Sequence, residues 1–128
     1  MIERLAADAN AAIDLLRADR ADPPPLRNAR RILLPLPVVG ELFAGARYSD
    51  RVSENLAQVE RLLDAWIVLS PDVETARVYG RIRGSVTRLS PARLNDLWIA
   101  ALCIQHDLPL LSNDRGFDAI PNLTTIRW

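Results

Sequence analysis

The sequence predicts an α/β fold in which helices cover a mainly parallel sheet. Short apolar segments of strand length alternate along the chain with longer segments whose apolar residues recur at helical spacing. The length of 128 residues suits one domain with its own core. The composition, with 49% hydrophobic and 25% charged residues, is that of an ordinary globular protein. We therefore expect residues 1–128 to form a single domain.

The first half of the chain contains two strand candidates, each followed by a helix. Residues 3–8 form a short buried strand that ends in an acid, and residues 10–20 form a helix that three prolines terminate. Residues 32–34 form the second strand. A helix starts at Pro37, because proline is tolerated in a first turn, and Ser53 is suited to cap the next helix.

The second half continues the alternation and supplies the most apolar helix. Ser70 or Asp72 is expected to cap one helix. Asn95 or Asp96 starts a nearly all-apolar helix, which predicts a central position covered on several sides. The remaining strand candidates are residues 67–69, 108–111 and 124–126.

The composition excludes several classes of function. The formal net charge is zero, so any nucleic-acid binding requires a local patch and not an overall basic field. All 16 cationic residues are arginine, which removes response-regulator and haloacid-dehalogenase-type phosphatase mechanisms, because both rely on a lysine. The chain has no Walker loop, no Gly-x-Gly-x-x-Gly motif and no zinc-like cluster of Cys and His. His106 alone is expected to be structural or solvated.

The sequence also predicts a cytoplasmic protein that does not enter a membrane. Cys103 is the only cysteine, so an internal disulfide is impossible, and its apolar neighbours indicate a buried structural thiol. The first residues do not begin a signal peptide. The longest apolar run, residues 97–104, is too short to span a bilayer.

Four acids stand where the predicted fold can bring them together. Asp8 follows the first strand and Asp114 the fourth, at the sheet edge where ligands bind in open parallel sheets. Asp96 begins the most apolar helix, and Glu41 lies in an otherwise apolar helical segment, where an unpaired buried charge is costly. Taken singly, Asp8 and Asp96 can be helix caps and Asp114 a turn residue. Their equivalent positions in the fold favour a shared site.

A cluster of carboxylates requires a compensating cation. Several carboxylates packed together cannot all stay ionised unless positive charge is supplied or their pKa values rise. Mg²⁺ prefers oxygen ligands, so Asp and Glu form its natural protein site. Such an ion activates water, orients a phosphate and stabilises a leaving oxygen, and phosphodiester hydrolysis is the reaction that most needs these effects.

An arginine-rich segment offers a way to hold a phosphate backbone. Between Glu74 and Asp96 there is no carboxylate, but there are five arginines, and another arginine follows Asp114. These side chains can form a cationic rim that binds phosphates, or else a solvated face or a surface that pairs with an acidic partner. The candidates for RNA binding are Arg81, Arg88, Arg93 and Arg115.

Several motifs along nearly the whole chain carry a family resemblance. Two of them are residues 95–101 (NDLWIAA) and 108–117 (LPLLSNDRGF). They resemble the C-terminal half of PIN-domain proteins, above all the VapC-type toxins of bacterial toxin–antitoxin pairs. Residues 8–13 (DANAAI) resemble the opening acidic motif of that family, and residues 36–46 (LPVVGELFAGA) its second motif. Residues 75–80 (TARVYG) are similar to a helix often found between them.

This resemblance implies a fold, an activity and a set of partners. The fold is a three-layer α/β/α sandwich with a central, mainly parallel sheet. The activity is a Mg²⁺- or Mn²⁺-dependent endoribonuclease that hydrolyses RNA with a metal-activated water, as the toxin of a type II pair. A homodimer is implied, together with a VapB-type antitoxin that places a peptide across the active site. The implied catalytic and metal-binding acids are Asp8, Glu41, Asp96 and Asp114, and the implied supporting residues are Asn10 and Ser112.

Two departures from the family pattern leave other functions open. Ala9 stands where the family usually has a hydroxyl residue, and residues 89–94 differ from the expected loop with Gly and Pro. A catalytically weakened PIN-like module that binds RNA or a partner is therefore the alternative. A DNA-directed nuclease with the same acids is also compatible with the sequence, because no residue can be identified as a contact to the RNA 2′-hydroxyl.

Overall fold

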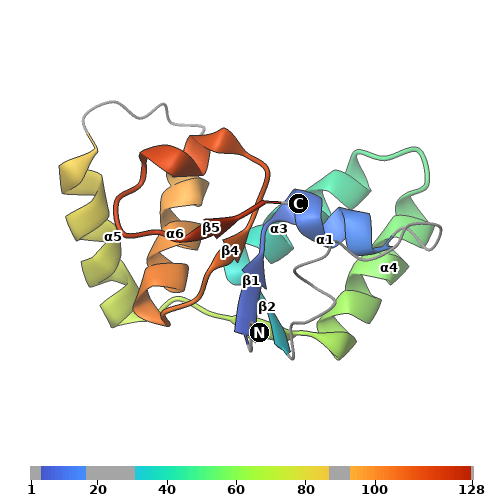
Figure 1. Cartoon of the computed structure of the whole chain (residues 1–128). Coiled ribbons are helices and arrows are strands. Elements are labelled where there is room, and N and C mark those ends of the chain that lie inside the picture. Colours follow the sequence, from blue (N-terminus) through green and yellow to red (C-terminus); the bar gives the residue numbers. More distant parts are fainter. Residues whose placement is uncertain (1–3, 17–30, 87–92, 128) are drawn as a thin grey trace.

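The computed structural model describes residues 4–16, 31–86 and 93–127 of the chain. Figure 1 shows a central sheet with α5 and α6 on one side and α1 and α4 on the other. The elements are β1 (Arg4–Ala7), α1 (Ala9–Leu16), β2 (Arg31–Pro35), α3 (Leu36–Arg47), α4 (Val52–Ala65), β3 (Ile67–Leu69), α5 (Val73–Ser85), α6 (Leu94–Gln105), β4 (Leu110–Leu111), the short 3₁₀ helix η2 (Arg115–Ala119) and β5 (Thr125–Ile126).

The sheet has five strands in the order β3-β2-β1-β4-β5, and every described pair is parallel. The predicted α/β/α sandwich with a mainly parallel sheet is confirmed. The central strand β1 pairs Ala6 with Leu33 of β2 on one side and with Leu110 of β4 on the other. Leu5, Ala6 and Ala7 are fully buried. A central parallel strand is covered on both faces, which explains why its sequence is continuously apolar and not alternating.

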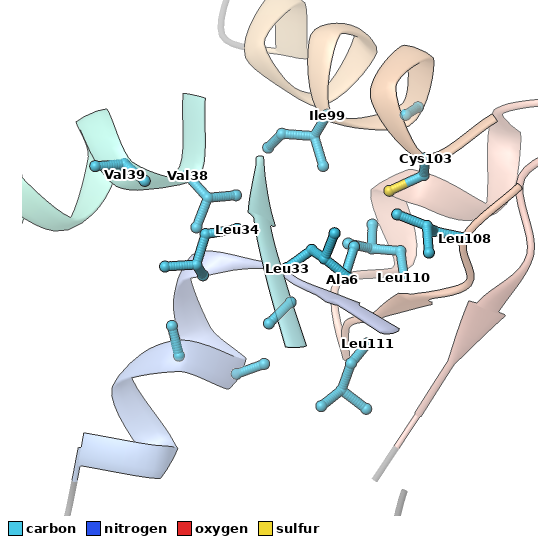
Figure 2. Close-up of a cluster of buried hydrophobic side chains, with 14 of the residues drawn as sticks. Ala6, Leu33, Leu34, Val38, Val39, Ile99, Cys103, Leu108, Leu110 and Leu111 are labelled. Atoms are coloured by element: carbon cyan, nitrogen blue, oxygen red, sulfur yellow. The ribbon is translucent and has the colours of Figure 1, made fainter. Parts of the chain in front are cut away.

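The apolar helix predicted in the second half of the chain is α6, and it is central. Six of its twelve residues are buried, and Figure 2 shows Ile99 and Cys103 directed toward the strands. The Cys103 thiol is free and completely buried, and burial raises its pKa to about 12. It is therefore a packing residue and not a nucleophile at neutral pH. Within the described residues, no helix has both the length and the apolar character needed to cross a membrane.

The structure corrects the predicted ends of several elements. Helix α4 begins at Val52 after Arg51, so Ser53 lies inside the first turn and does not cap it. Helix α6 begins at Leu94 after Arg93, so neither Asn95 nor Asp96 is its cap. Strand β4 begins two residues later than predicted, because the Leu108 N–H donates to Cys103 and closes the end of α6. Residues 17–20 and the three prolines lie outside the described residues.

The predicted cap of α5 is confirmed at Asp72, and it also links two helices. The Asp72 carboxylate accepts the Thr75 N–H at 3.0 Å, and the Thr75 hydroxyl accepts the Asp72 N–H at 2.9 Å. This reciprocal arrangement is a capping box. Gln105, at the end of α6, donates to the Asp72 carboxylate at 3.0 Å and lies within hydrogen-bonding distance of the Thr75 hydroxyl. The cap therefore ties α5 to α6.

We expect Thr75→Val to lower the free energy of unfolding by about 1–2 kcal/mol, because valine keeps the shape of a fully buried side chain and leaves its hydrogen-bonding partners unsatisfied. Urea denaturation followed by circular dichroism measures this loss. Ser85→Ala is the matched control, since that exposed hydroxyl donates to the Arg81 carbonyl of its own helix, and its effect should stay within about 0.5 kcal/mol. Equal losses in the two variants would contradict the role given to Thr75.

Candidate active site

The strand order places a topological switch point at the carboxyl ends of β1 and β4. The chain leaves β1 toward β2 on one side and leaves β4 toward β5 on the other, so the two connections diverge at this pair of strands. Ligands of open α/β sheets bind at such a switch point. Ala7 is in register with Leu111, which brings Asp8 beside Ser112. The sequence predicted a site at the carboxyl edge, and the structure identifies the two strands.

Asp8 is the most deeply buried of the four predicted acids, with 6% of its surface exposed. Its Oδ1 accepts the Ala11 N–H at 2.9 Å, so it does cap α1. Burial is the main cause that raises the pKa of this carboxyl, and the charges of Asp114 and Asp96 raise it further. Hydrogen bonds from Ser112 and the Ala11 N–H act in the opposite direction. The capping role and a site role are therefore compatible in the same side chain.

Asp96 and Asp114 face each other across a single arginine. One guanidinium nitrogen of Arg93, Nη1, lies 3.0 Å from Asp96 Oδ2 and 3.1 Å from Asp114 Oδ2. Burial raises the pKa of Asp96, and Arg93 only partly offsets this. The pKa of Asp114 is lowered, first by the Gly116 N–H, which donates to its Oδ1 at 2.8 Å, and then by Arg93. Asp114 also caps η2, so it is a turn residue as well as a neighbour of the other acids.

Glu41 is exposed on α3, so it is not a buried charge, although its neighbours in the sequence are apolar. Its apolar neighbours in the sequence, Val39 and Leu42, occupy the opposite face of the helix and are buried. Partial desolvation is the main cause that raises the pKa of Glu41, and the charges of Asp96 and Asp8 raise it further. A hydrogen bond from Asn95 acts in the opposite direction. Glu41 is therefore near enough to the other acids for their charges to raise its pKa.

The four carboxylates come from four segments and repel one another. Electrostatic repulsion among them contributes to the raised pKa values of Asp8, Glu41 and Asp96. Among the described residues, no three acidic, His or Cys side chains are close enough together to hold a metal ion as they stand. The possible ligands, however, are carboxylate oxygens, and the positive charge near them does not balance their negative charge. The chemistry of these ligands therefore fits a hard divalent cation better than any other group.

The two predicted supporting residues differ in position. Ser112 has 1% of its surface exposed, accepts the Asp114 N–H at 3.0 Å and hydrogen-bonds to Asp8, so it links two of the acids. Asn10 lies exposed in the first turn of α1, and the structure describes no hydrogen bond between its side chain and the four acids. Asn95 hydrogen-bonds to Glu41, and no signal in the sequence predicted this contact.

Of the predicted RNA-binding arginines in the described residues, only Arg93 contacts the acids. Arg81 is exposed on α5, 4.0 Å from Glu74, which also pairs with Arg77. Arg115 is exposed beside Asp114, and Arg88 lies outside the described residues. The sequence contained a signal for the Arg93–Asp96 pair, because the two residues are three positions apart at a helix start. It contained none for the pairing with Asp114.

A hollow elsewhere on the molecule is unrelated to these acids. It is lined by residues from the end of α6, the turn before β4 and the segment before β5, including Cys103, Leu108 and Asn122. These residues lie at the amino ends of β4 and β5. The acids lie at the carboxyl ends, so the hollow is not part of the candidate site.

Comparison with known proteins yields one family match and several relatives. The model of the PIN domain matches residues 6–123. Ribonuclease VapC5 of Mycobacterium tuberculosis is 29% identical over 100 residues, which cover 75% of this chain and 73% of the relative. Ribonuclease VapC2 of Haemophilus influenzae is 29% identical over 104 residues, which cover 80% and 79%.

Solved structures show the same fold. DNA-bound VapBC from Salmonella typhimurium has a chain with a TM-score of 0.81 and 27% identity, covering 100% of this chain and 99% of that one. VapBC2 from Rickettsia felis, bound to a promoter DNA fragment, has a chain with a TM-score of 0.82 and 21% identity, covering 98% of both. Because the family model matches residues 6–123 of the 128 in the chain, the chain belongs to the PIN-domain family.

Proposed function

We propose that this protein is a divalent-metal-dependent endoribonuclease that hydrolyses RNA phosphodiester bonds and is the toxin of a type II toxin–antitoxin pair. The observation that carries the proposal is the gathering of Asp8, Glu41, Asp96 and Asp114 at the switch point of a PIN fold, three of them with raised pKa values. The relatives named as VapC ribonucleases support the same reaction class.

In this proposal the four acids are the catalytic residues and together hold Mg²⁺ or Mn²⁺. The bound ion would supply charge stabilisation and lower the pKa of water in the site. The chain itself fixes the ligands: Ser112 and the Ala11 N–H orient Asp8, and the Gly116 N–H orients Asp114. Such hydrogen bonds around metal ligands determine how well a site is organised before the ion arrives.

The remaining roles follow the family likeness. Arg81, Arg88, Arg93 and Arg115 are proposed to contact the RNA backbone, and Asn10 to support the acids once metal and substrate are bound. The VapBC complexes among the similar structures support a VapB-type antitoxin as the partner, and we propose a homodimer of single-domain chains. A lone cysteine, which cannot form an internal disulfide, suits the reducing cytoplasm.

Metal removal tests this function directly. The purified chain is incubated with labelled single-stranded RNA, and with DNA of the same sequence, in Mg²⁺, Mn²⁺ or excess EDTA. We expect RNA cleavage with either ion, none in EDTA, and little cleavage of DNA. Cleavage that persists in EDTA would contradict a metal site, and cleavage of DNA alone would contradict a ribonuclease.

A second candidate is a PIN-like module that binds RNA or a partner with weakened catalysis. Ala9 in place of a hydroxyl residue and the Arg93 guanidinium between two of the acids both favour it. This candidate predicts that Mn²⁺ leaves the melting temperature almost unchanged and that RNA stays intact.

A further inference from the structure

Arg93 occupies the space between two acids that are proposed to hold the metal ion. Its Nη1 lies 3.0 Å from Asp96 Oδ2, 3.2 Å from Asp114 Oδ1 and 3.1 Å from Asp114 Oδ2. One nitrogen atom thus contacts three carboxylate oxygens from two segments of the chain. A cation that bridges Asp96 and Asp114 would make the same kind of contacts, so the chain supplies its own positive charge at this point.

Gly116 provides the room that this guanidinium needs. A Cβ atom at Gly116 would lie 1.7 Å from Arg93 Nη1 and 2.4 Å from its Cζ, so no larger residue fits beside Arg93 in its present position. No glycine in the described residues has a positive φ, so the backbone at Gly116 does not itself require glycine. The missing side chain therefore serves the close approach of Arg93, and an alanine would displace the guanidinium without straining the backbone.

We propose that Arg93 is an internal counter-ion that neutralises Asp96 and Asp114 in the metal-free protein and is displaced when a divalent ion binds. This inference rests on the metal site of the proposed function. A guanidinium and a divalent cation repel each other, and a cation held between Asp96 and Asp114 would need the space that Arg93 Nη1 occupies in the metal-free protein. The ion pairs are also partly exposed, with 39% of the Arg93 side chain and 40% of the Asp114 side chain accessible, so they are weak enough to exchange.

Displacement of Arg93 also links metal binding to RNA binding. A released guanidinium at the entrance to the acids needs a new anionic partner, and a phosphate of the RNA backbone suits its forked donor geometry. RNA that holds Arg93 away from the acids removes the competition for the ion. By thermodynamic reciprocity, the ion then strengthens RNA binding to the same degree.

The experiment is a calorimetric titration of the full chain with Mn²⁺ in the absence of RNA. We expect Arg93→Gln and Gly116→Ala each to tighten Mn²⁺ binding by about three- to tenfold. The first variant removes the charge, and the second keeps the charge and removes only the contact. Arg61→Gln, at an exposed position on α4, is the charge-matched control and should leave the affinity within about twofold. Circular dichroism in EDTA verifies that each variant is folded.

The outcomes separate competition from general electrostatics. Unchanged or weaker binding in Arg93→Gln overturns the proposal. Tighter binding in Arg93→Gln without any change in Gly116→Ala also overturns it, because the effect would then come from net charge alone. A non-cleavable 2′-O-methyl RNA provides the second readout: it should tighten Mn²⁺ binding in the wild type and not in Arg93→Gln.

Failure of this inference and failure of the proposed function are distinguishable. The titration with Mn²⁺ alone involves no turnover. Tighter binding in both variants, together with intact RNA in the cleavage assay, would support the role of Arg93 and reject the ribonuclease. Metal-dependent cleavage with identical Mn²⁺ affinities in all variants would support the ribonuclease and reject the role of Arg93.

Discussion

Asp96→Asn is expected to lower the rate of RNA cleavage by at least about a hundredfold, because loss of a residue that only orients a metal ligand already costs about 10–100-fold. Asp96 lies in the first turn of α6, where the helix N-terminus favours a negative charge, and it faces the other acids. Asparagine keeps the shape of the side chain but removes the charge that holds a cation. Cleavage of labelled RNA under saturating Mg²⁺ measures the change.

Asp107→Asn is the matched control for this prediction. Asp107 follows the other end of α6 and is exposed, and its φ of 53° is one that asparagine adopts readily. The same change of carboxylate to amide should therefore leave cleavage and melting temperature almost unaltered. Asp96→Asn cleaving RNA at the rate of the control would remove Asp96 from the catalytic residues.

Local sequence signals were sufficient to predict the sheet and the positions of two acids. A continuously apolar strand, such as Leu5–Ala7, is typical of the centre of a parallel sheet, and an acid directly after such a strand lies at its carboxyl edge. Asp8 and Asp114 were predicted for this reason, and the structure places them beside the switch point. The all-apolar α6 was likewise recognisable as central before its partners were known.

The parts that the sequence did not reveal depend on contacts between distant segments. The face on which Glu41 lies depends on how α3 packs, and a single acid among apolar residues fits either face of a helix. Arg93 pairs with Asp114, 21 residues away, and this pairing requires the loop after β4 to meet the start of α6. Strand order is a tertiary property as well, so the carboxyl edge could be predicted and the switch point between β1 and β4 could not.

The site acids illustrate a conflict between stability and function. Burial disfavours the charged form of Asp8, and the charges of Asp114 and Asp96 add to this, so the pKa of Asp8 in the folded protein is raised above 3.8. A group with such a raised pKa destabilises the folded state at neutral pH, because the unfolded chain carries the charge at lower cost. The fold tolerates this arrangement, as expected where a cation normally supplies the missing charge.

Asp8→Asn is therefore expected to raise the melting temperature of the metal-free protein while lowering RNA cleavage by at least about a hundredfold. The asparagine oxygen can still accept the Ala11 N–H and cap α1, so the helix loses little. What the variant loses is the charge that is proposed to bind the ion. Mn²⁺ should accordingly raise the melting temperature of the wild type and leave that of Asp8→Asn nearly unchanged.

The rise in melting temperature expected for Asp8→Asn should depend on pH in one direction. The folded protein binds a proton at Asp8 more readily than the unfolded chain does, so the destabilisation by Asp8 disappears as the pH falls through the raised pKa toward 3.8. The difference in melting temperature between Asp8→Asn and the wild type should be largest at pH 7 and shrink toward pH 4. Thermal unfolding in EDTA across this range measures the difference.

Asp72→Asn provides a control of opposite sign. Hydrogen bonds from Thr75 and Gln105 lower the pKa of Asp72, so its carboxylate stabilises the folded state above pH 3.8, and that contribution is lost only at lower pH. Asp72→Asn should therefore lower the melting temperature at every pH from 4 to 7. Two outcomes would show that the Asp8 charge is already compensated within the chain. One is an Asp8→Asn protein that is less stable than the wild type at pH 7. The other is a difference in melting temperature between the two proteins that grows as the pH falls. The acids would then have no need of a cation.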